Sequence, residues 1–305
     1  MRTPPASYRN APQLPSGDEI HLDHVGHFVD GAEAASMALA RAGFTPTPAS
    51  VQVNPDPAGG PPRLTGTGNV CAMLRGGYLE MLFKTADTPL GAEFDQARAR
   101  YPGLHLVAFA IADAAASHRR LEEASFPMQP LVAMQRPVDT AEGPGIAAFE
   151  VVRLAPGVMP EGRVQVLRHL TEQTVWQPRW LDHPNGAQCL RSLVTVVADL
   201  REATDRFSRF TGRPAQMAGG ASRIALDRGS LEFVDVDTWT ERWPALAVPS
   251  LPFMGQCVIE VASLDVLKRC LEAGGFAPQS TGGGLSVPFP PALGHGMWTF
   301  VASPE

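Results

Sequence analysis

The chain repeats one pattern of apolar and polar positions. In the first copy, an apolar run at 22–29 predicts a strand, and Asp30 after it is a natural N-cap. The amphipathic stretch 32–41 then predicts a helix that ends at a glycine. Two further apolar runs, 70–74 and 78–83, flank a Gly-Gly turn and predict a hairpin. This copy is expected to fold as a strand, a helix and several strands.

Three more copies follow at similar spacing. Each begins with an apolar run, continues through a capped amphipathic helix and ends in strand signals. The runs and their caps are 105–112 with Asp113, 192–197 with Asp199, and 257–261 with Ser263. Four such βαβββ units indicate an internal repeat and an α+β fold.

Composition and net charge limit the kinds of partner that the chain is expected to bind. The chain has 305 residues, enough for about two domains, with 44% hydrophobic and 18% charged residues. Its net charge of −6 comes without any Lys/Arg-rich run, so we expect neither nucleic acid nor a membrane surface as a partner. Small molecules, as ligand or substrate, or proteins remain as partners, and a homodimer is also possible.

The cysteines and the N-terminus indicate a cytoplasmic protein. The four cysteines are scattered and form no CxxC pair, which favours free thiols in a reducing compartment; they are Cys71, Cys189, Cys257 and Cys270. Residues 1–20 contain no apolar core behind the basic residue, so no secretory signal is expected there.

Three sequence segments carry a family resemblance. LDHVGHFVD at 22–30, GTGN at 66–69 and GGYLEML at 76–82 are similar to the glyoxalase-like domain family of the vicinal oxygen chelate superfamily, which includes glyoxalase I, extradiol dioxygenases and bleomycin-resistance proteins. The resemblance covers about residues 20–303. It implies that the four units pair into two cups of curved sheet, and that the first and last strands of a unit supply ligands for a metal.

The resemblance and the repeat together give a domain organisation. An N-terminal extension, 1–19, precedes a domain of two units at 20–186, whose final part at about 169–186 is a connector rich in Pro and turn residues. A second domain of two units follows at 187–305. We expect each domain to form one cup.

Strand alternation selects the candidate ligands of the first unit. Side chains alternate between the two faces of a strand, so His24 shares a face with Leu22 and Phe28, while His27 points the other way. The resemblance favours His24 as a metal ligand, and Glu80 as a second ligand and catalytic base. A hydrogen-bonded core histidine is the alternative for His24.

The second unit offers weaker partners. Asp30 lies six residues after His24, and six residues before the next cap, Asp113, stands Val107. His105 lies two residues earlier, about 6 to 7 Å along the strand, and would need a bulge to reach the cup. When the last strands of the two units are aligned, Gln165 takes the position that Glu80 has in the first unit. His169 is a further residue that could reach the cup. The predicted metal set is therefore His24, Glu80, His105 and Gln165.

The second cup offers no such set. The same count from the third and fourth caps gives Leu193 and Cys257, and Thr299 stands where a second carboxylate is expected. Glu232 alone matches Glu80, and we expect it to form a structural ion pair. The C-terminal half is therefore predicted to be structural or to cover the ligand.

Two segments are candidates for contact with substrate. The stretch 45–69 is Pro/Gly-rich and without periodicity, which predicts a lid or binding loop. The segment 168–186 is dense in aromatic and polar residues and is either a substrate wall or a strap that packs its tryptophans on the core. The predicted substrate-binding residues are Tyr78, Phe28, Asn69, His169 and Trp176.

Two functions remain as hypotheses. In the first, a divalent ion (Zn, Ni, Mn or Fe) chelates adjacent substrate oxygens, and the protein is a lyase, isomerase or dioxygenase for a small oxygen-bearing molecule. In the second, the protein binds or sequesters a small molecule without a metal, as the resemblance to bleomycin-resistance proteins implies. The missing histidine at Val107 and the glutamine at 165 motivate the second hypothesis.

Overall fold

The computed structural model describes residues 12–56 and 58–303. Residues 1–11 of the predicted N-terminal extension lie outside the described residues. The prediction that residues 1–20 contain no secretory signal therefore concerns mainly residues that the structure does not describe. No helix within the described ranges has the length and apolar character needed to cross a membrane. All four cysteines are free thiols.

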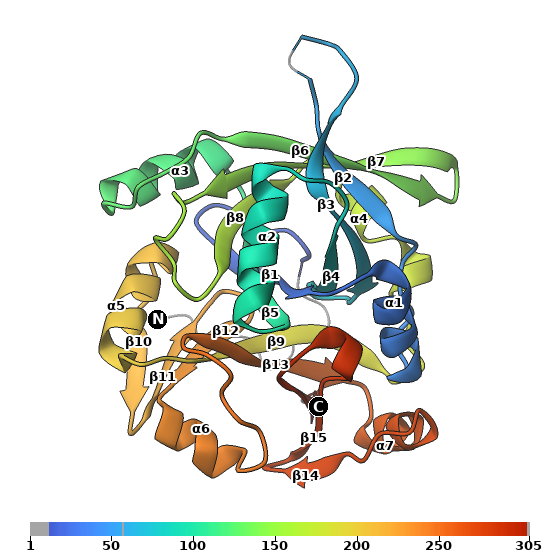
Figure 1. Ribbon diagram of the computed structural model, residues 1–305, viewed down its shortest axis with the longest axis vertical. Helices are drawn as coiled ribbons and strands as arrows, with labels where there is room; N and C mark the ends of the chain where they lie inside the picture. Colours follow the sequence, from blue (N-terminus) through green and yellow to red (C-terminus); the bar gives the residue numbers. More distant parts are fainter. Residues whose placement is uncertain (1–11, 57, 304–305) are drawn as a thin grey trace.

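The two N-terminal βαβββ units are present as predicted (Figure 1). The first consists of β1 (Ile20–Phe28), α1 (Ala32–Arg41), β2 (Ser50–Asn54), β3 (Arg63–Met73) and β4 (Tyr78–Lys84). The second consists of β5 (Gly103–Ile111), α3 (Ala114–Glu123), β6 (Val132–Thr140), β7 (Gly143–Arg153) and β8 (Arg163–His169).

The two C-terminal units repeat this order. The third consists of β9 (Ala187–Val196), α5 (Leu200–Thr211), β10 (Ala215–Ala218), β11 (Ala221–Ala225) and β12 (Ser230–Val234). The fourth consists of β13 (Phe253–Val261), α7 (Leu264–Ala273), β14 (Gln279–Thr281), β15 (Gly284–Pro288) and β16 (Met297–Ala302).

Five further helices lie outside this repeat pattern in the described residues. Four lie between units: α2 (Pro89–Arg100), α4 (Glu172–Val175), η1 (Pro178–Trp180) and α6 (Val236–Arg242); η2 (Pro291–Leu293) lies between β15 and β16. Helix α2 has a strong local signal, because Thr88 caps it through the Gly91 amide and Pro89 occupies its first turn. It was not part of the predicted repeat, because it lies between two units.

The N-terminal half closes into a barrel. Its strands pair in the order β1-β4-β3-β2-β6-β7-β8-β5, and β5 pairs back to β1. At β2 and β6 the two units meet through the ladder pair Val53 and Gln135 and through the hydrogen bond from Ser50 Oγ to the Pro137 carbonyl. The predicted cup is therefore an eight-stranded barrel, and side chains that alternate inward from every strand line its interior.

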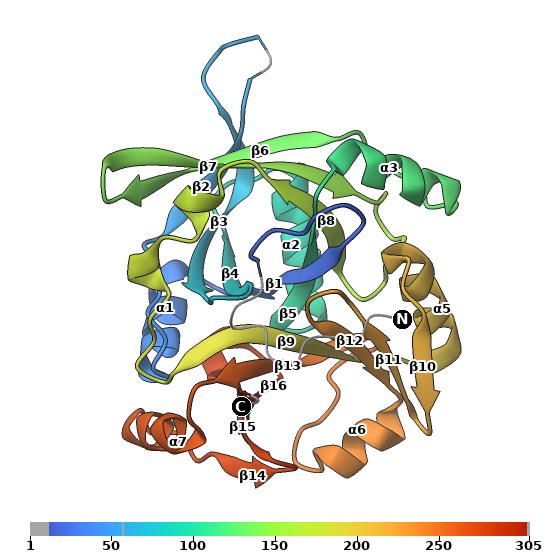
Figure 2. The ribbon, with the colours of Figure 1, turned by 180° about the vertical axis from the view of Figure 1, so that it is seen from behind.

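The C-terminal half stays open. Its strands run β10-β11-β12-β9-β13-β16-β15-β14, and no pairing between β10 and β14 is found in the described part of the chain. Figure 2 shows β9 and β13 lying below the barrel. One apolar core, which includes Leu39, Leu121, Phe207 and Leu267 from the four repeat helices, extends through both halves.

Three of the four predicted helix caps are confirmed. Asp113, Asp199 and Ser263 each accept a hydrogen bond from an amide in the first turn of the helix that follows. The cap predicted at Asp30 is wrong, because Gly31 is the N-cap of α1 and Asp30 instead pairs with Arg98 on α2.

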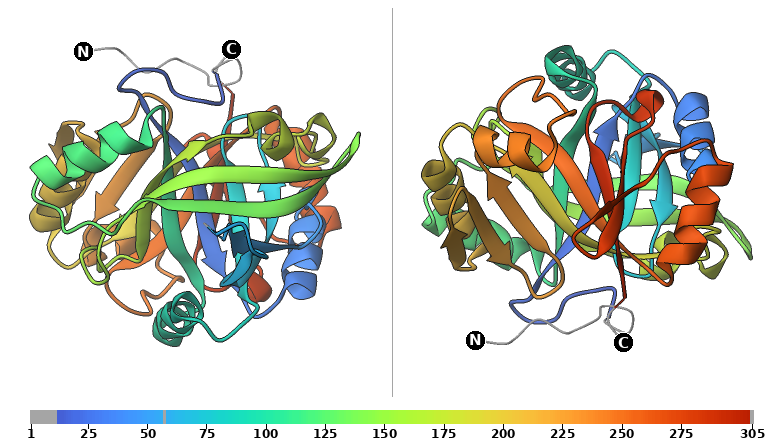
Figure 3. Two further views of the ribbon diagram at one scale, coloured as in Figure 1. Left: turned by 90° about the horizontal axis from the view of Figure 1, so that it is seen from above. Right: turned by 90° about the horizontal axis from the view of Figure 1, so that it is seen from below.

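The stretch 45–69, predicted to be a lid or a binding loop, is not one long loop, although Gln52 and Asn69 from it line the site described below. This stretch forms β2 and the first part of β3, which pair with each other and complete the barrel (Figure 3). Its prolines and glycines lie mainly before β2 and in the turn between the strands. The two strands carry inward-facing polar residues that become part of the site.

Candidate active site in the N-terminal barrel

A buried carboxylate orients two histidines near the barrel interior. Asp23 on β1 is fully buried; its Oδ2 lies 2.7 Å from His24 Nδ1 and its Oδ1 lies 3.0 Å from His169 Nε2. Burial alone would raise the pKa of Asp23, but His169 and His24 hold it well below its usual range. Because an ionised carboxylate only accepts hydrogen bonds, His24 donates through Nδ1. In the neutral imidazole, Nε2 then carries the free lone pair.

Glu80 on β4 is held in the same interior. Its Oε1 accepts hydrogen bonds from Gln52 Nε2 at 3.2 Å and from Asn69 Nδ2 at 2.6 Å. Its Oε2 lies 3.5 Å from His24 Nε2. One carboxylate oxygen is thus fixed by two amides, and the other faces the free nitrogen of His24.

Tyr78 forms one wall of this site. Its ring stacks on the His24 imidazole with the ring centroids 4.3 Å apart. Burial, followed by the nearby charges of Asp23 and Glu80, raises the pKa of Tyr78 well above its usual value. The phenol is therefore neutral and is available as a hydrogen-bond donor.

Three arginines face the same space from the second unit. Arg153 Nε donates to Gln165 Oε1 at 3.3 Å, because the two residues are cross-strand neighbours on β7 and β8. Arg136 on β6 and Arg163 on β8 also line the cavity. Burial lowers the pKa of Arg163 to about 10 and lowers that of Arg153. These guanidiniums are still charged at neutral pH.

These side chains surround a small cavity inside the barrel. Its volume is about 30 Å³, enough for a water molecule or a single ion. Its polar and charged lining is His24, Gln52, Asn69, Tyr78, Glu80, Gln135, Arg136, Arg153, Arg163 and Gln165. The structure therefore brings together the predicted His24, Glu80, Gln165, Tyr78 and Asn69.

The face predicted for His24 is correct except at one residue. His24 and Phe28 lie on the barrel side, whereas His27 points away and donates from Nδ1 to the carbonyl of Leu293 at 2.9 Å. Leu22 was expected on the His24 side but packs in the core outside the barrel. A register shift between Leu22 and His24 interrupts the alternation and lets Asp23 reach His169.

The counterpart of His24 in the second unit is Leu106, not Val107. His24 lies opposite Tyr78, two residues before Glu80; in the same way Leu106 lies opposite Arg163, two residues before Gln165. The count from the caps was one residue off because it began at Asp30 instead of Gly31. The alignment of Gln165 with Glu80 agrees with this register.

His105 lies apart from the cavity. It falls at a second register shift, between Leu104 and Leu106, so the bulge that its position required is present. The bulge turns the imidazole toward Tyr101, with Nε2 2.6 Å from the Tyr101 carbonyl and the two rings stacked. The structure does not bring His105 to His24 and Glu80.

The other predicted contacts surround the site without lining the cavity. Trp176 packs against Tyr78 and His169, with ring centroids at 6.1 and 4.6 Å. His169 contacts Asp23, and Phe28 stacks on Phe94 of α2. Trp176 belongs to the apolar cluster of the barrel, as the strap interpretation expects.

The corrected register also applies to the second cup. The counterparts of His24 there are Ser192 and Gln256, not Leu193 and Cys257. Glu232 pairs with Arg242 at 2.6 Å, in agreement with the expected structural role.

Sequence reasoning missed six residues of the site: Asp23, Gln52, Gln135, Arg136, Arg153 and Arg163. The signal for Arg163 was present, because it stands two residues before Gln165 and strand alternation puts both on one face. Gln52 was missed because its strand was interpreted as a lid or binding loop. The orientation of the Asp23 side chain depends on a bulge in β1, which no local sequence pattern predicts.

The donor set fits a divalent ion only with an amide included. Within residues 12–56 and 58–303, no group of three or more His, Cys, Asp or Glu side chains could hold a metal. His24 and Glu80 together with the Gln165 amide oxygen nevertheless supply three N/O donors around one cavity. The bond from Asp23 to His24 is the type of contact that orients a metal-binding imidazole.

Solved structures share this fold. A hypothetical protein from Staphylococcus aureus is 10% identical and superposes with a TM-score of 0.64, covering 93% of this chain and 99% of the other. A mutant of 4-hydroxymandelate synthase from Streptomyces coelicolor is 14% identical with a TM-score of 0.54, covering 93% and 92%. A fusion protein of a xylose isomerase-like TIM barrel and 4-hydroxyphenylpyruvate dioxygenase is 11% identical with a TM-score of 0.53, covering 95% and 50%.

At 10 to 14% identity, these likenesses show that the chain shares its fold with these proteins. The sequence profile of the glyoxalase-like domain matches residues 22–211, and the chain belongs to that family. The match includes the barrel from Leu22 onward and reaches the end of α5. No curated protein matches the sequence.

Proposed function

We propose that this protein is a divalent-metal-dependent enzyme that acts on a small oxygen-bearing molecule inside the N-terminal barrel. The observation that carries the proposal is the 3.5 Å separation of His24 Nε2 and Glu80 Oε2, with the other atoms of both groups already bonded. Two ligands about 2.1 Å from a tetrahedral ion lie about 3.4 Å apart. Gln165 is the third ligand.

The protein's own groups have distinct roles in this proposal. His24, Glu80 and Gln165 would hold the ion, and the chemistry that it would supply is polarisation of adjacent substrate oxygens. Asp23 keeps the Nε2 lone pair of His24 directed into the cavity, and Gln52 and Asn69 hold Glu80 in one rotamer. Glu80 would accept a proton from the substrate as general base when its Oε2 does not hold the ion. Tyr78 donates a hydrogen bond to a substrate oxygen.

Metal content tests the proposal. We expect protein purified without chelator, or incubated with Zn, Ni, Mn or Fe, to hold about one ion per chain by mass spectrometry. His24→Ala and Glu80→Gln should each lose the ion, and Glu232→Gln, at the matching position of the other half, should keep it. Folded wild-type protein that never holds stoichiometric metal would contradict the proposal.

A second candidate is metal-free binding of a small molecule. It is supported by the contact from Arg153 to Gln165, which occupies the amide oxygen that a metal would need, and by the three arginines near the cavity. A thermal-shift series with and without divalent ions separates the two candidates, because a ligand of the folded state raises the melting temperature. Stabilisation by organic compounds alone, independent of metal, favours this candidate.

A further inference from the structure

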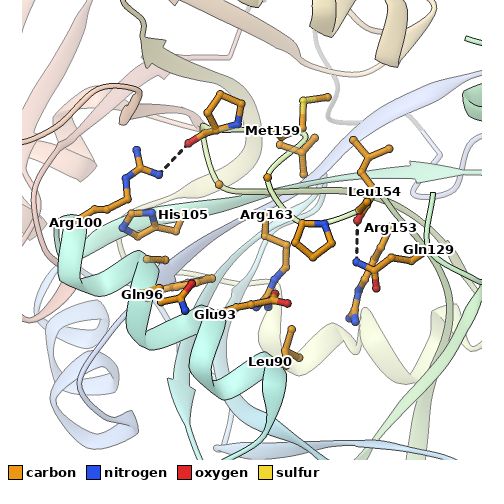
Figure 4. Close-up of a pocket in the computed structure, with 18 residues that line it drawn as sticks. Leu90, Glu93, Gln96, Arg100, His105, Gln129, Arg153, Leu154, Met159 and Arg163 are labelled. Atoms are coloured by element: carbon orange, nitrogen blue, oxygen red, sulfur yellow. Dashed lines mark hydrogen bonds and ion pairs between the residues drawn. The ribbon is translucent and has the colours of Figure 1, made fainter. Parts of the chain in front are cut away.

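A larger cleft lies beside the barrel interior. Its volume is about 350 Å³, within the range of small-ligand pockets. Helix α2 forms one side, and the segment 154–162 and the start of β8 form the other (Figure 4). The proposed metal ligands do not line this cleft.

Two arginines connect the cleft with the interior cavity. Arg153 and Arg163 line both spaces, so their guanidiniums lie at the boundary between them. Figure 4 shows both side chains between α2 and the 154–162 segment. A molecule that fills the cleft and contacts these groups therefore reaches the border of the site with His24 and Glu80.

The remaining walls of the cleft are mainly apolar. Phe28, Leu90, Leu154 and Met159 line it, and the Arg163 guanidinium lies 5.3 Å from the centre of the Phe28 ring. These walls suit the hydrocarbon or aromatic body of a ligand, and the arginines suit its polar end.

The arginines have too few acidic partners for their number. Arg163 has Glu93 at 3.9 Å, and Glu93 is half exposed on α2. Among the described residues, no carboxylate lies within ion-pair distance of Arg153, whose side-chain contacts are Gln165 Oε1 and Met134 Sδ. Arg136, which is 7% exposed, adds a third cation on the interior side. Because buried cations are costly without a counter-charge, an anionic ligand would stabilise this arrangement.

We propose that the cleft and the interior cavity form one binding site for a small carboxylate with an apolar body. The carboxylate lies between Arg153 and Arg163, and the body lies along Phe28, Leu90, Leu154 and Met159. A planar carboxylate matches the fork of a guanidinium with two parallel hydrogen bonds. This inference rests on the proposed function only in placing the reacting end of the ligand near His24 and Glu80.

Matched probe molecules test the charge requirement without any mutation. Phenylacetate and phenylacetamide have nearly the same shape, but only the first is an anion. Isothermal titration or ligand-observed NMR on the full chain, after dialysis against chelator, should show binding of phenylacetate and about tenfold weaker or no binding of phenylacetamide. Equal binding of both, or no binding of phenylacetate at millimolar concentration, overturns the proposal.

Variants test the location. Arg163→Met keeps most of the side-chain length but removes the charge, and should weaken phenylacetate binding about tenfold or more. Arg168→Met is the control, because Arg168 lies on the same strand, is exposed and pairs with Glu150. If Arg163→Met does not fold by circular dichroism, Arg153→Met replaces it. Unchanged binding in a folded variant contradicts the site.

The same titrations separate this inference from the proposed function. Phenylacetate binding in metal-free protein depends on the arginines alone. Stoichiometric metal without phenylacetate binding would reject the carboxylate site and leave the metal proposal intact. Charge-dependent phenylacetate binding in protein that never holds metal would support the carboxylate site and reject the metal proposal.

Discussion

The two halves repeat the same units, yet they differ in what fills them. In the N-terminal half the strands close, and polar side chains from several strands meet inside the barrel. In the C-terminal half the sheet stays open, and α6 places Trp239 in an apolar cluster with Val194, Val234 and Phe253. A repeated topology therefore does not repeat a site. The side chains at the inward positions decide whether the interior keeps a polar cavity or is filled by an apolar plug, here the side chain of Trp239.

The two matching acids show the same contrast at single-residue scale. Glu80 is 4% exposed and is held by two neutral amides beside His24. Glu232 is partly exposed and is neutralised by Arg242 at 2.6 Å. The carboxylate that lacks a full cationic partner is the one that can serve a metal or accept a proton.

Removing the plug of the C-terminal half should have the largest effect. Trp239 is fully buried, and its Nε1 donates to the Leu246 carbonyl at 2.9 Å. Trp239→Ala should lower the free energy of unfolding by about 3 to 5 kcal/mol, because it leaves a large cavity. Urea denaturation measures this, and Val236→Ala on the exposed part of the same helix is the control. A loss below about 1 kcal/mol would show that the helix is not a structural plug.

The link between the halves should be the next most sensitive feature. Arg206 on α5 forms two hydrogen bonds of 2.8 Å with Glu161, whose side chain is almost fully buried in the segment before β8. Arg206→Met leaves this carboxylate unpaired and should cost about 3 kcal/mol in urea denaturation. Arg201→Met, at an exposed position of the same helix, should change little. Equal losses in both variants would refute a specific role of the pair.

Acid should destabilise the N-terminal half more than the C-terminal half. Burial lowers the pKa values of His21, His27 and His105 to about 4, and all three lie in the N-terminal half. Because the unfolded chain binds these protons near pH 6.5, stability is complete above that pH and is lost as pH falls toward 4.

The expected loss is up to about 1.4 kcal/mol per pH unit for each histidine. His27→Gln should reduce the slope of unfolding free energy against pH between 6.5 and 4 by about this amount. Urea denaturation at several pH values measures the slope. An unchanged slope in the variant would mean that His27 accepts a proton in the folded protein.

The smallest effect should come from the acid of the C-terminal half. Glu232→Gln removes a partly exposed ion pair, and such pairs contribute about 1 kcal/mol or less. We expect a small change in melting temperature. A loss of several kcal/mol would show that Glu232 is as strongly constrained as Glu80.

The family resemblance, together with strand alternation, was enough to find the centre of the site. The resemblance pointed to His24 and Glu80, the alignment of one unit with another added Gln165, and the structure places the three around one cavity. The count for the counterpart of His24 gave Val107 instead of Leu106. It started from Asp30 as the N-cap of α1, whereas Gly31 is the N-cap and Asp30 pairs with Arg98. An error of one residue in a strand reverses the face, so such a count requires a correct cap.

The sequence by itself determined the repeat, the four units, most helix caps and the inward positions of β4 and β8. These features depend on local periodicity and capping, which act over a few residues. Only the tertiary structure decided the closure of one half and the plugging of the other. It also decided the bulges that turn Asp23 toward His169 and His105 away from the cavity. These depend on pairing between strands distant in sequence, which no local pattern contains.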